Sequence, residues 1–194
     1  DNVQTKKQLK KVLAKIFAKY GAEETAKTAD RMKGQAFRFA TAAAISTGAK
    51  VVNPNLTVWQ VSGDGDGLAI GGNHFIHAMR RNIDINIILL NNRIYGLTKG
   101  QYSPTSPRGF VSKSSPYGTV EDPFRPAELC FGARGHFFAR SVATDAKGTQ
   151  EILKAAKLHK GVAVCEILQN CVIFNNGVYD SVYTNEGRKK NCIY

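Results

Sequence analysis

The chain has 194 residues and a formal net charge of +12, from 27 Lys and Arg against 15 Asp and Glu. Its length suits one domain with extensions, and no apolar run approaches the roughly 18–20 residues that cross a bilayer. The first residues lack the apolar stretch of a secretory signal, so we expect a cytoplasmic protein without a membrane contact. Aromatic residues are not interleaved with the basic ones as in an RNA-binding sheet, so we expect no nucleic acid; a phosphate-rich cofactor or an acidic protein partner accounts for the charge.

Residues 6–20 place apolar side chains at helical spacing, with lysines on the opposite face. A basic amphipathic helix of this kind can lie on a membrane, but it is more often a surface or subunit-contact helix. We therefore expect residues 1–35 to form a basic helical extension. Residues 36–194 then form the main α/β domain, which begins with an alanine-rich helix over 36–50.

From residue 56 onward the pattern alternates between strands and helices. We expect strands over 56–62, 84–91, 136–143 and 161–169, and helices over 71–82, 125–135 and 148–160. Nearly continuous apolar strands suit a parallel sheet that is covered on both faces. The order predicts a doubly wound, mostly parallel α/β sheet with its ligand loops at the carboxyl ends of the strands. The loop over 96–126 is unusually long, and such loops are often functional.

Acidic and amide residues follow the first two of these strands. Asp64 lies in a Gly-Asp-Gly-Asp stretch, and Asn91 and Asn92 follow the second strand, with 25 residues between Gly65 and Asn91. If the strands are neighbours, these side chains meet at one edge of the sheet, and their oxygens are the ligands that Mg²⁺ or Ca²⁺ prefers. The glycines let a backbone approach a phosphate, and the helix start around Asn73 favours anions. The alternative is two ordinary polar turns.

This spacing resembles the fingerprint of thiamin diphosphate enzymes, in which Gly-Asp-Gly is followed by Asn-Asn. In that family the aspartate, the second asparagine and the carbonyl two residues later hold Mg²⁺. The resemblance places these metal ligands on Asp64, Asn92 and Ile94. The residues expected to contact the cofactor are Gly63, Asp64, Gly65, Asp66, Asn73, Asn92 and Lys99. Lys99 stays open between an anion contact and a solvated loop lysine, and no catalytic residue is assigned.

Longer stretches of the sequence resemble one particular group of thiamin diphosphate enzymes. Residues 71–87, 91–106, 114–140 and 166–175 are very similar to the β subunits of the 2-oxoacid:ferredoxin oxidoreductases, and 91–106 is most like the 2-oxoglutarate branch. The resemblance implies oxidative decarboxylation of a 2-oxoacid with thiamin diphosphate and Mg²⁺, which gives acyl-coenzyme A, CO₂ and reduced ferredoxin. It also implies a hetero-oligomer, active only with a larger partner subunit that supplies the glutamate beside the aminopyrimidine ring.

The sequence departs from that family near its ends. The β subunits bind a four-iron four-sulfur cluster through four cysteines, and only Cys171 has a counterpart here as an iron–sulfur ligand. A His-Gly-Arg that serves the thiamin site is reduced to Gly34 between Lys33 and Gln35. We therefore expect an atypical or truncated N-terminus and a short C-terminus; the alternative is that residues 1–35 are not a faithful sequence. For the function, the alternatives to an oxidoreductase subunit are a non-oxidative thiamin enzyme subunit and an inactive scaffold that retains the fold.

Overall fold

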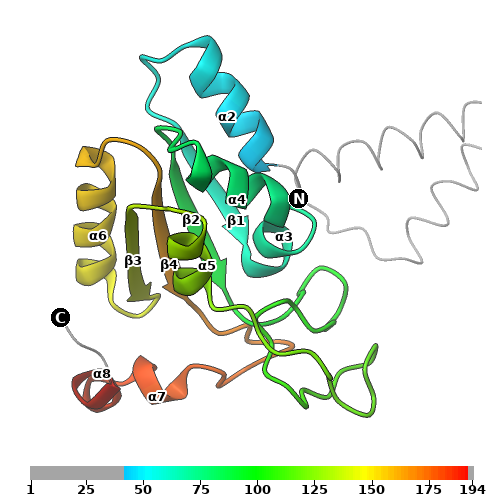
Figure 1. Cartoon of the computed structure of the whole chain (residues 1–194). Helices are drawn as coiled ribbons and strands as arrows, with labels where there is room; N and C mark the ends of the chain where they lie inside the picture. Colours follow the sequence, from blue (N-terminus) through cyan, green and yellow to red (C-terminus); the bar gives the residue numbers. More distant parts are fainter. Residues whose placement is uncertain (1–41, 192–194) are drawn as a thin grey trace, which may run out of the picture. The chain divides into compact units, whose positions relative to one another are not determined.

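A four-stranded parallel sheet forms the centre of the computed structural model, which describes residues 42–191 (Figure 1). The strands are ordered β1-β2-β4-β3, and all three neighbouring pairs are parallel. The predicted doubly wound α/β fold is confirmed. The elements are α2 (Ala42–Val52), β1 (Trp59–Gly63), α3 (Asp64–Leu68), α4 (Gly72–Arg80), β2 (Asn86–Asn91), α5 (Pro126–Gly132), β3 (Phe137–Val142), α6 (Ala146–Leu158), β4 (Ala163–Leu168), α7 (Asp180–Tyr183) and α8 (Asn185–Asn191).

Helices cover the two faces of the sheet, with α4 and α5 on one face and α6 on the other (Figure 1). Alternate residues of β4 point to opposite faces, as the strand pleat requires. Val164 packs with Phe75 of α4 and Cys130 of α5, whereas Cys165 packs with Ala156 of α6. Burial on both faces explains why β2 and β4 read as nearly continuous apolar runs, whereas Trp59 and Val61 of the edge strand β1 are exposed.

Local signals set the ends of the helices that follow the long loop. Pro126 stands in the first turn of α5, where its missing N–H costs nothing. This helix ends earlier than predicted, and Arg134 just beyond it has a left-handed φ of +65°. The helix predicted from residue 148 begins at Ala146, because the Asp145 side chain caps it by accepting the Gly148 N–H at 3.0 Å.

Several predictions fall on residues that the structure does not describe. These are the basic helix over 6–20, the domain boundary near residue 35 and the segment 33–35. In the described range, the loop over 96–126 contains no strand and no helix before α5 begins at Pro126. None of the helices between residues 42 and 191 is both long enough and apolar enough to cross a membrane.

Candidate metal and cofactor site

The carboxyl ends of β1 and β2 bring the two predicted metal-binding segments together. The strands are parallel neighbours, with Gly63 paired to Leu90. Asp64 follows β1 directly as the first residue of α3, and Asn92 follows β2. The Asn92 N–H points at Oδ1 of Asp64 across 3.4 Å. The expected meeting of the acidic and amide segments is therefore present in the fold.

The carboxylate of Asp64 is removed from water without a neighbouring cation. Asp64 is only 1% exposed, and no salt bridge within residues 42–191 involves it. Burial raises its pKa, against the opposing effect of hydrogen bonds from Ser103 and Thr105. A desolvated carboxylate of this kind gains most from a hard divalent cation, so the side chain fits the predicted metal.

The turn after β2 supplies the other two predicted ligands. Oδ1 of Asn92 accepts the Ile94 N–H at 3.1 Å, and Arg93 between them adopts a left-handed φ of +54°. The Asn175 amide fixes the turn by donating to the Asn92 carbonyl at 2.9 Å. Within the described range, no hydrogen bond ends on the carbonyl oxygen of the buried Ile94, so a metal at this oxygen would displace no protein donor.

The oxygen donors fit Mg²⁺ better than a softer metal. Nowhere in residues 42–191 do three or more His, Cys, Asp or Glu side chains gather around a common point. A metal at this edge would therefore depend on one carboxylate together with amide and carbonyl oxygens, which is a donor set for a hard cation.

The long loop folds back over Asp64 and holds one of its oxygens. The hydroxyls of Ser103 and Thr105 each donate to Oδ2 of Asp64 at 2.5 Å. Both hydroxyl residues are buried, and Thr105 also lies 3.0 Å from Oδ1 of Asn91. Because Oδ2 is occupied, Oδ1 is the freer oxygen for a metal. Neither hydroxyl stands out in the sequence, where they are part of a Ser-Pro-Thr-Ser run in the long loop over 96–126.

A second buried carboxylate continues the hydrogen bonds across the sheet. Asn91 is the last residue of β2 and donates through Nδ2 to Oε1 of Glu166 at 2.7 Å. Glu166 in β4 is 0% exposed, and the Arg140 guanidinium of β3 donates to its Oε2 at 2.6 Å. In the sequence, the sign of this buried carboxylate is a lone glutamate inside an apolar strand. Hydrogen bonds thus run from Arg140 through Glu166 to Asn91. Oδ1 of Asn91 lies 3.0 Å from the Thr105 hydroxyl, whose single proton is donated to Asp64.

Packing against Tyr95 requires a glycine at position 65, which the sequence alone does not reveal. A Cβ atom at this position would lie 2.3 Å from the Tyr95 ring, so no larger residue fits. The Tyr95 hydroxyl donates to the Gly65 carbonyl at 2.8 Å. Gly63 ends β1 and precedes the first turn of α3. Both glycines lie beside Asp64, and their contact with a phosphate stays a prediction.

The other residues expected at the cofactor are exposed. Asp66 belongs to α3, Asn73 lies in the first turn of α4, and Lys99 occupies a tight turn with a left-handed φ of +68°. No hydrogen bond or salt bridge among the described residues joins any of the three to Asp64. They are free to meet a ligand, and their roles stay predictions.

Cys171 lies next to the turn that carries Asn92. It forms a short bridge with Asn175, whose amide donates to the Asn92 carbonyl. Cys171 is partly exposed, whereas Cys130 and Cys165 are buried in the two cores, where burial raises each thiol pKa to about 11. Of these three cysteines, Cys171 is the one placed to reach a ligand.

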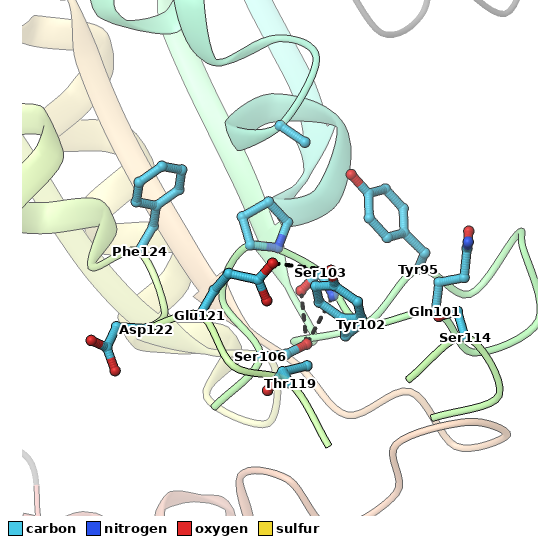
Figure 2. Close-up of a pocket in the computed structure, with 12 residues that line it drawn as sticks. Tyr95, Gln101, Tyr102, Ser103, Ser106, Ser114, Thr119, Glu121, Asp122 and Phe124 are labelled. Atoms are coloured by element: carbon cyan, nitrogen blue, oxygen red, sulfur yellow. Dashed lines mark hydrogen bonds between the residues drawn. The ribbon is translucent and has the colours of Figure 1, made fainter. Parts of the chain in front are cut away.

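A cavity of about 680 Å³ opens beside this site. Figure 2 shows Tyr95, Ser103 and Glu121 on its wall, and Ser103 also bonds Asp64. The Tyr102 hydroxyl lies 3.4 Å from a Glu121 oxygen. The volume is that of a small-molecule site, typically ~300–1,000 Å³.

The hydroxyls on Asp64 are expected to orient it for a metal. Replacing Ser103 by Ala and Thr105 by Val should lower Mn²⁺ affinity about 10–100-fold, as loss of the groups that orient a ligand generally does. Electron paramagnetic resonance of free Mn²⁺ measures this in the full chain. Ser114→Ala is the control, because Ser114 lines the same cavity and does not contact Asp64. Equal affinity in all variants would remove the positioning role.

Glu166 is expected to matter for stability. Glu166→Ala leaves the buried Asn91 amide without its acceptor and takes the carboxylate away from the half-exposed Arg140, which should cost about 1–3 kcal/mol. Glu166→Gln keeps an acceptor for Asn91 and should cost less. Urea unfolding measures the difference, and Glu128→Ala, which breaks an exposed pair with Arg125, should leave the midpoint almost unchanged. A small effect of Glu166→Ala would contradict the network.

Comparison with known proteins identifies the family of the chain. The family model described as "Thiamine pyrophosphate enzyme, C-terminal TPP binding domain" matches residues 13–167. The 2-oxoglutarate oxidoreductase subunit KorB of Mycobacterium tuberculosis is 53% identical over 152 residues, 78% of this chain and 40% of that protein. The 2-oxoglutarate synthase subunit KorB of Archaeoglobus fulgidus is 45% identical over 130 residues, 67% of this chain and 49% of that protein.

A solved structure shares the same fold. The 2-oxoglutarate:ferredoxin oxidoreductase from Magnetococcus marinus, with 2-oxoglutarate, coenzyme A and succinyl-CoA bound, matches with a TM-score of 0.67 and 36% identity. The match covers 78% of this chain and 50% of that one. The chain thus spans half or less of the length of these relatives, and its resemblance to the β subunits of 2-oxoacid:ferredoxin oxidoreductases is confirmed. The family model covers more than half of the chain, and the chain therefore belongs to the thiamine pyrophosphate enzymes.

Proposed function

We propose that the chain is the cofactor-binding part of the β subunit of a 2-oxoglutarate:ferredoxin oxidoreductase. The reaction is oxidative decarboxylation of the 2-oxoacid in the presence of coenzyme A, which gives acyl-coenzyme A and CO₂ and passes two electrons to ferredoxin. The observation that carries the proposal is the 53% identity to a relative named as a 2-oxoglutarate oxidoreductase subunit. The buried Asp64 beside Asn92 supports it, because this carboxylate has hydrogen-bond donors but no cation among the described residues, as a metal-binding carboxylate would.

The residues of this chain would bind and orient the cofactor. Thiamin diphosphate, when bound, supplies the carbon nucleophile and the electron sink for decarboxylation. Asp64, Asn92 and the Ile94 carbonyl would hold Mg²⁺, on which the diphosphate is anchored. The contacts proposed around the diphosphate come from Gly63, Gly65, Asp66, Asn73 and Lys99. Ser103 and Thr105 would keep the carboxylate of Asp64 turned toward the metal.

A partner subunit would complete the active site. Thiamin enzymes generally use a glutamate beside the aminopyrimidine ring, and none follows β1 or β2 directly in this sequence. Glu166 is the buried glutamate of the sheet, and both its oxygens are already bonded to Arg140 and Asn91. We infer that the larger subunit of a hetero-oligomer contributes this glutamate at the interface, and that the complex works in the cytoplasm.

Electrons would leave through an iron–sulfur cluster. Cys171 is proposed as one of its ligands, since it lies next to the Asn92 turn and stays partly exposed. Four thiolates normally hold such a cluster, and this sequence has no other cysteine in a matching position. The remaining ligands would come from elsewhere in the complex.

Asp64 is expected to carry metal-dependent cofactor binding. Asp64→Ala should abolish Mg²⁺-dependent binding of thiamin diphosphate, because the one carboxylate ligand is lost. Isothermal titration calorimetry with and without Mg²⁺ measures this. Asp84→Ala is the control, because Asp84 lies before the opposite end of β2 and pairs with Lys50. Unchanged affinity in Asp64→Ala would rule out the proposed metal site.

The isolated chain is expected to show no turnover. Without the partner glutamate it should not reduce ferredoxin or a viologen dye with 2-oxoglutarate and coenzyme A, whereas the reconstituted complex should. Turnover by the chain alone, with partner contamination excluded by mass spectrometry, would refute the two-subunit proposal. CO₂ release by the complex without dye reduction would support the non-oxidative alternative.

Iron analysis of the same complex with Cys171→Ser tests the cluster ligand.

A further inference from the structure

A second cavity, of about 420 Å³, lies at the carboxyl ends of β2, β3 and β4. Residues 123–128 close one side of it, and Tyr179 closes another. Thr105 and Asn91 form part of its wall, so it is one hydrogen bond away from Asp64. The proposed function assigns nothing to this space.

Positive charge outweighs negative charge around the cavity. Its wall contains three arginines and two glutamates, and each glutamate is paired with one arginine. Arg93 has no carboxylate partner among residues 42–191, and its guanidinium carbon lies 5.0 Å from the centre of the Tyr179 ring. Arg140 uses Nε for Glu166, which leaves its two terminal nitrogens as further donors.

The Tyr179 hydroxyl is an unexplained polar group on this wall. Tyr179 is 5% exposed, and its hydroxyl has no hydrogen-bond partner among the described residues. Its backbone is fixed, because the N–H donates to the Asn170 side chain at 3.0 Å. Burial raises the pKa of this phenol, so it stays protonated as a donor. A buried hydroxyl without a partner is rare, and a missing ligand is one of its standard explanations.

We propose that this cavity binds a small oxyanion, a carboxylate or phosphate group, through Arg93, Arg140 and the Tyr179 hydroxyl. Guanidinium groups present two N–H donors in the geometry of such an anion, and the phenol adds a third direction. The anion would satisfy the orphaned hydroxyl and offset the unpaired charge of Arg93. The cavity size lies within the usual range for small ligands, roughly 300–1,000 Å³. This cavity adjoins the proposed metal site through Thr105 and Arg93, and the contacts proposed for the anion do not include the metal.

The test titrates the full chain with inorganic phosphate and, separately, with 2-oxoglutarate. EDTA removes divalent metal, and sodium chloride keeps the ionic strength constant. Calorimetry should show saturable binding of at least one anion, and Tyr179→Phe should weaken it about tenfold, the effect of one hydrogen bond to a charged group. The phenyl ring still packs under Arg93 and the lost hydroxyl bonded nothing, so this variant should fold with unreduced thermal stability. Tyr117→Phe, at a fully exposed tyrosine, should bind as the unmodified chain does.

The two arms identify the ligand chemistry. Tighter binding of phosphate assigns the site to a phosphate-bearing ligand, and tighter binding of 2-oxoglutarate assigns it to a carboxylate. Absence of saturable binding for both anions, or equal binding by Tyr179→Phe and the unmodified chain, would overturn the proposal. Mg²⁺-dependent binding of thiamin diphosphate is measured on the same proteins, so a failure of the proposed function is seen separately.

Discussion

A carboxylate that is taken out of water must be met by donors or by a cation, and this requirement organises the carboxyl end of the sheet. Two carboxylates are buried there, Asp64 after β1 and Glu166 in β4. Glu166 is met by the guanidinium of Arg140 and the amide of Asn91. Asp64 receives two hydroxyls but no cation from the described side chains. This difference between the two carboxylates is the reason for proposing the metal at Asp64.

The order of the strands makes the connection between these carboxylates possible. Because β4 lies between β2 and β3, Glu166 is directly opposite Arg140 on one side and Leu89 on the other. Asn91, two residues after Leu89, points to the same face of the sheet and reaches Glu166 diagonally. Apolar residues such as Val164 occupy the same face nearer the amino end of the strand. The polar network therefore begins where the apolar core ends.

The sequence predicted the type and order of the strands and of the longer helices because their periodicity is strong, but it did not predict the short helices α3, α7 and α8. It predicted that Asp64 and Asn92 meet because parallel strands end at one edge. It could not separate the roles of the two adjacent asparagines. Asn91 still belongs to the strand and points at Glu166, whereas Asn92 lies beyond it in the turn. Ser103 and Thr105 lie 39 and 41 residues from Asp64 in a loop without periodicity, so only the folded chain reveals their contact. The partner of Glu166 depended on strand order, which the pattern of apolar residues does not give.

The central position of β4 has a consequence for how the protein folds. It is the last strand of the described chain, yet it lies between β2 and β3. Until residues 163–168 have been synthesised and inserted, β3 therefore has no strand partner and β2 has only β1. Contacts between distant parts of a chain form slowly, because the loops between them must first be closed at a cost in entropy. Asn91 and Arg140 acquire their common partner only at that step. We therefore expect the ligand-binding edge to mature together with the last strand, so that a nascent chain released before that point would present β2 as an open edge prone to aggregation.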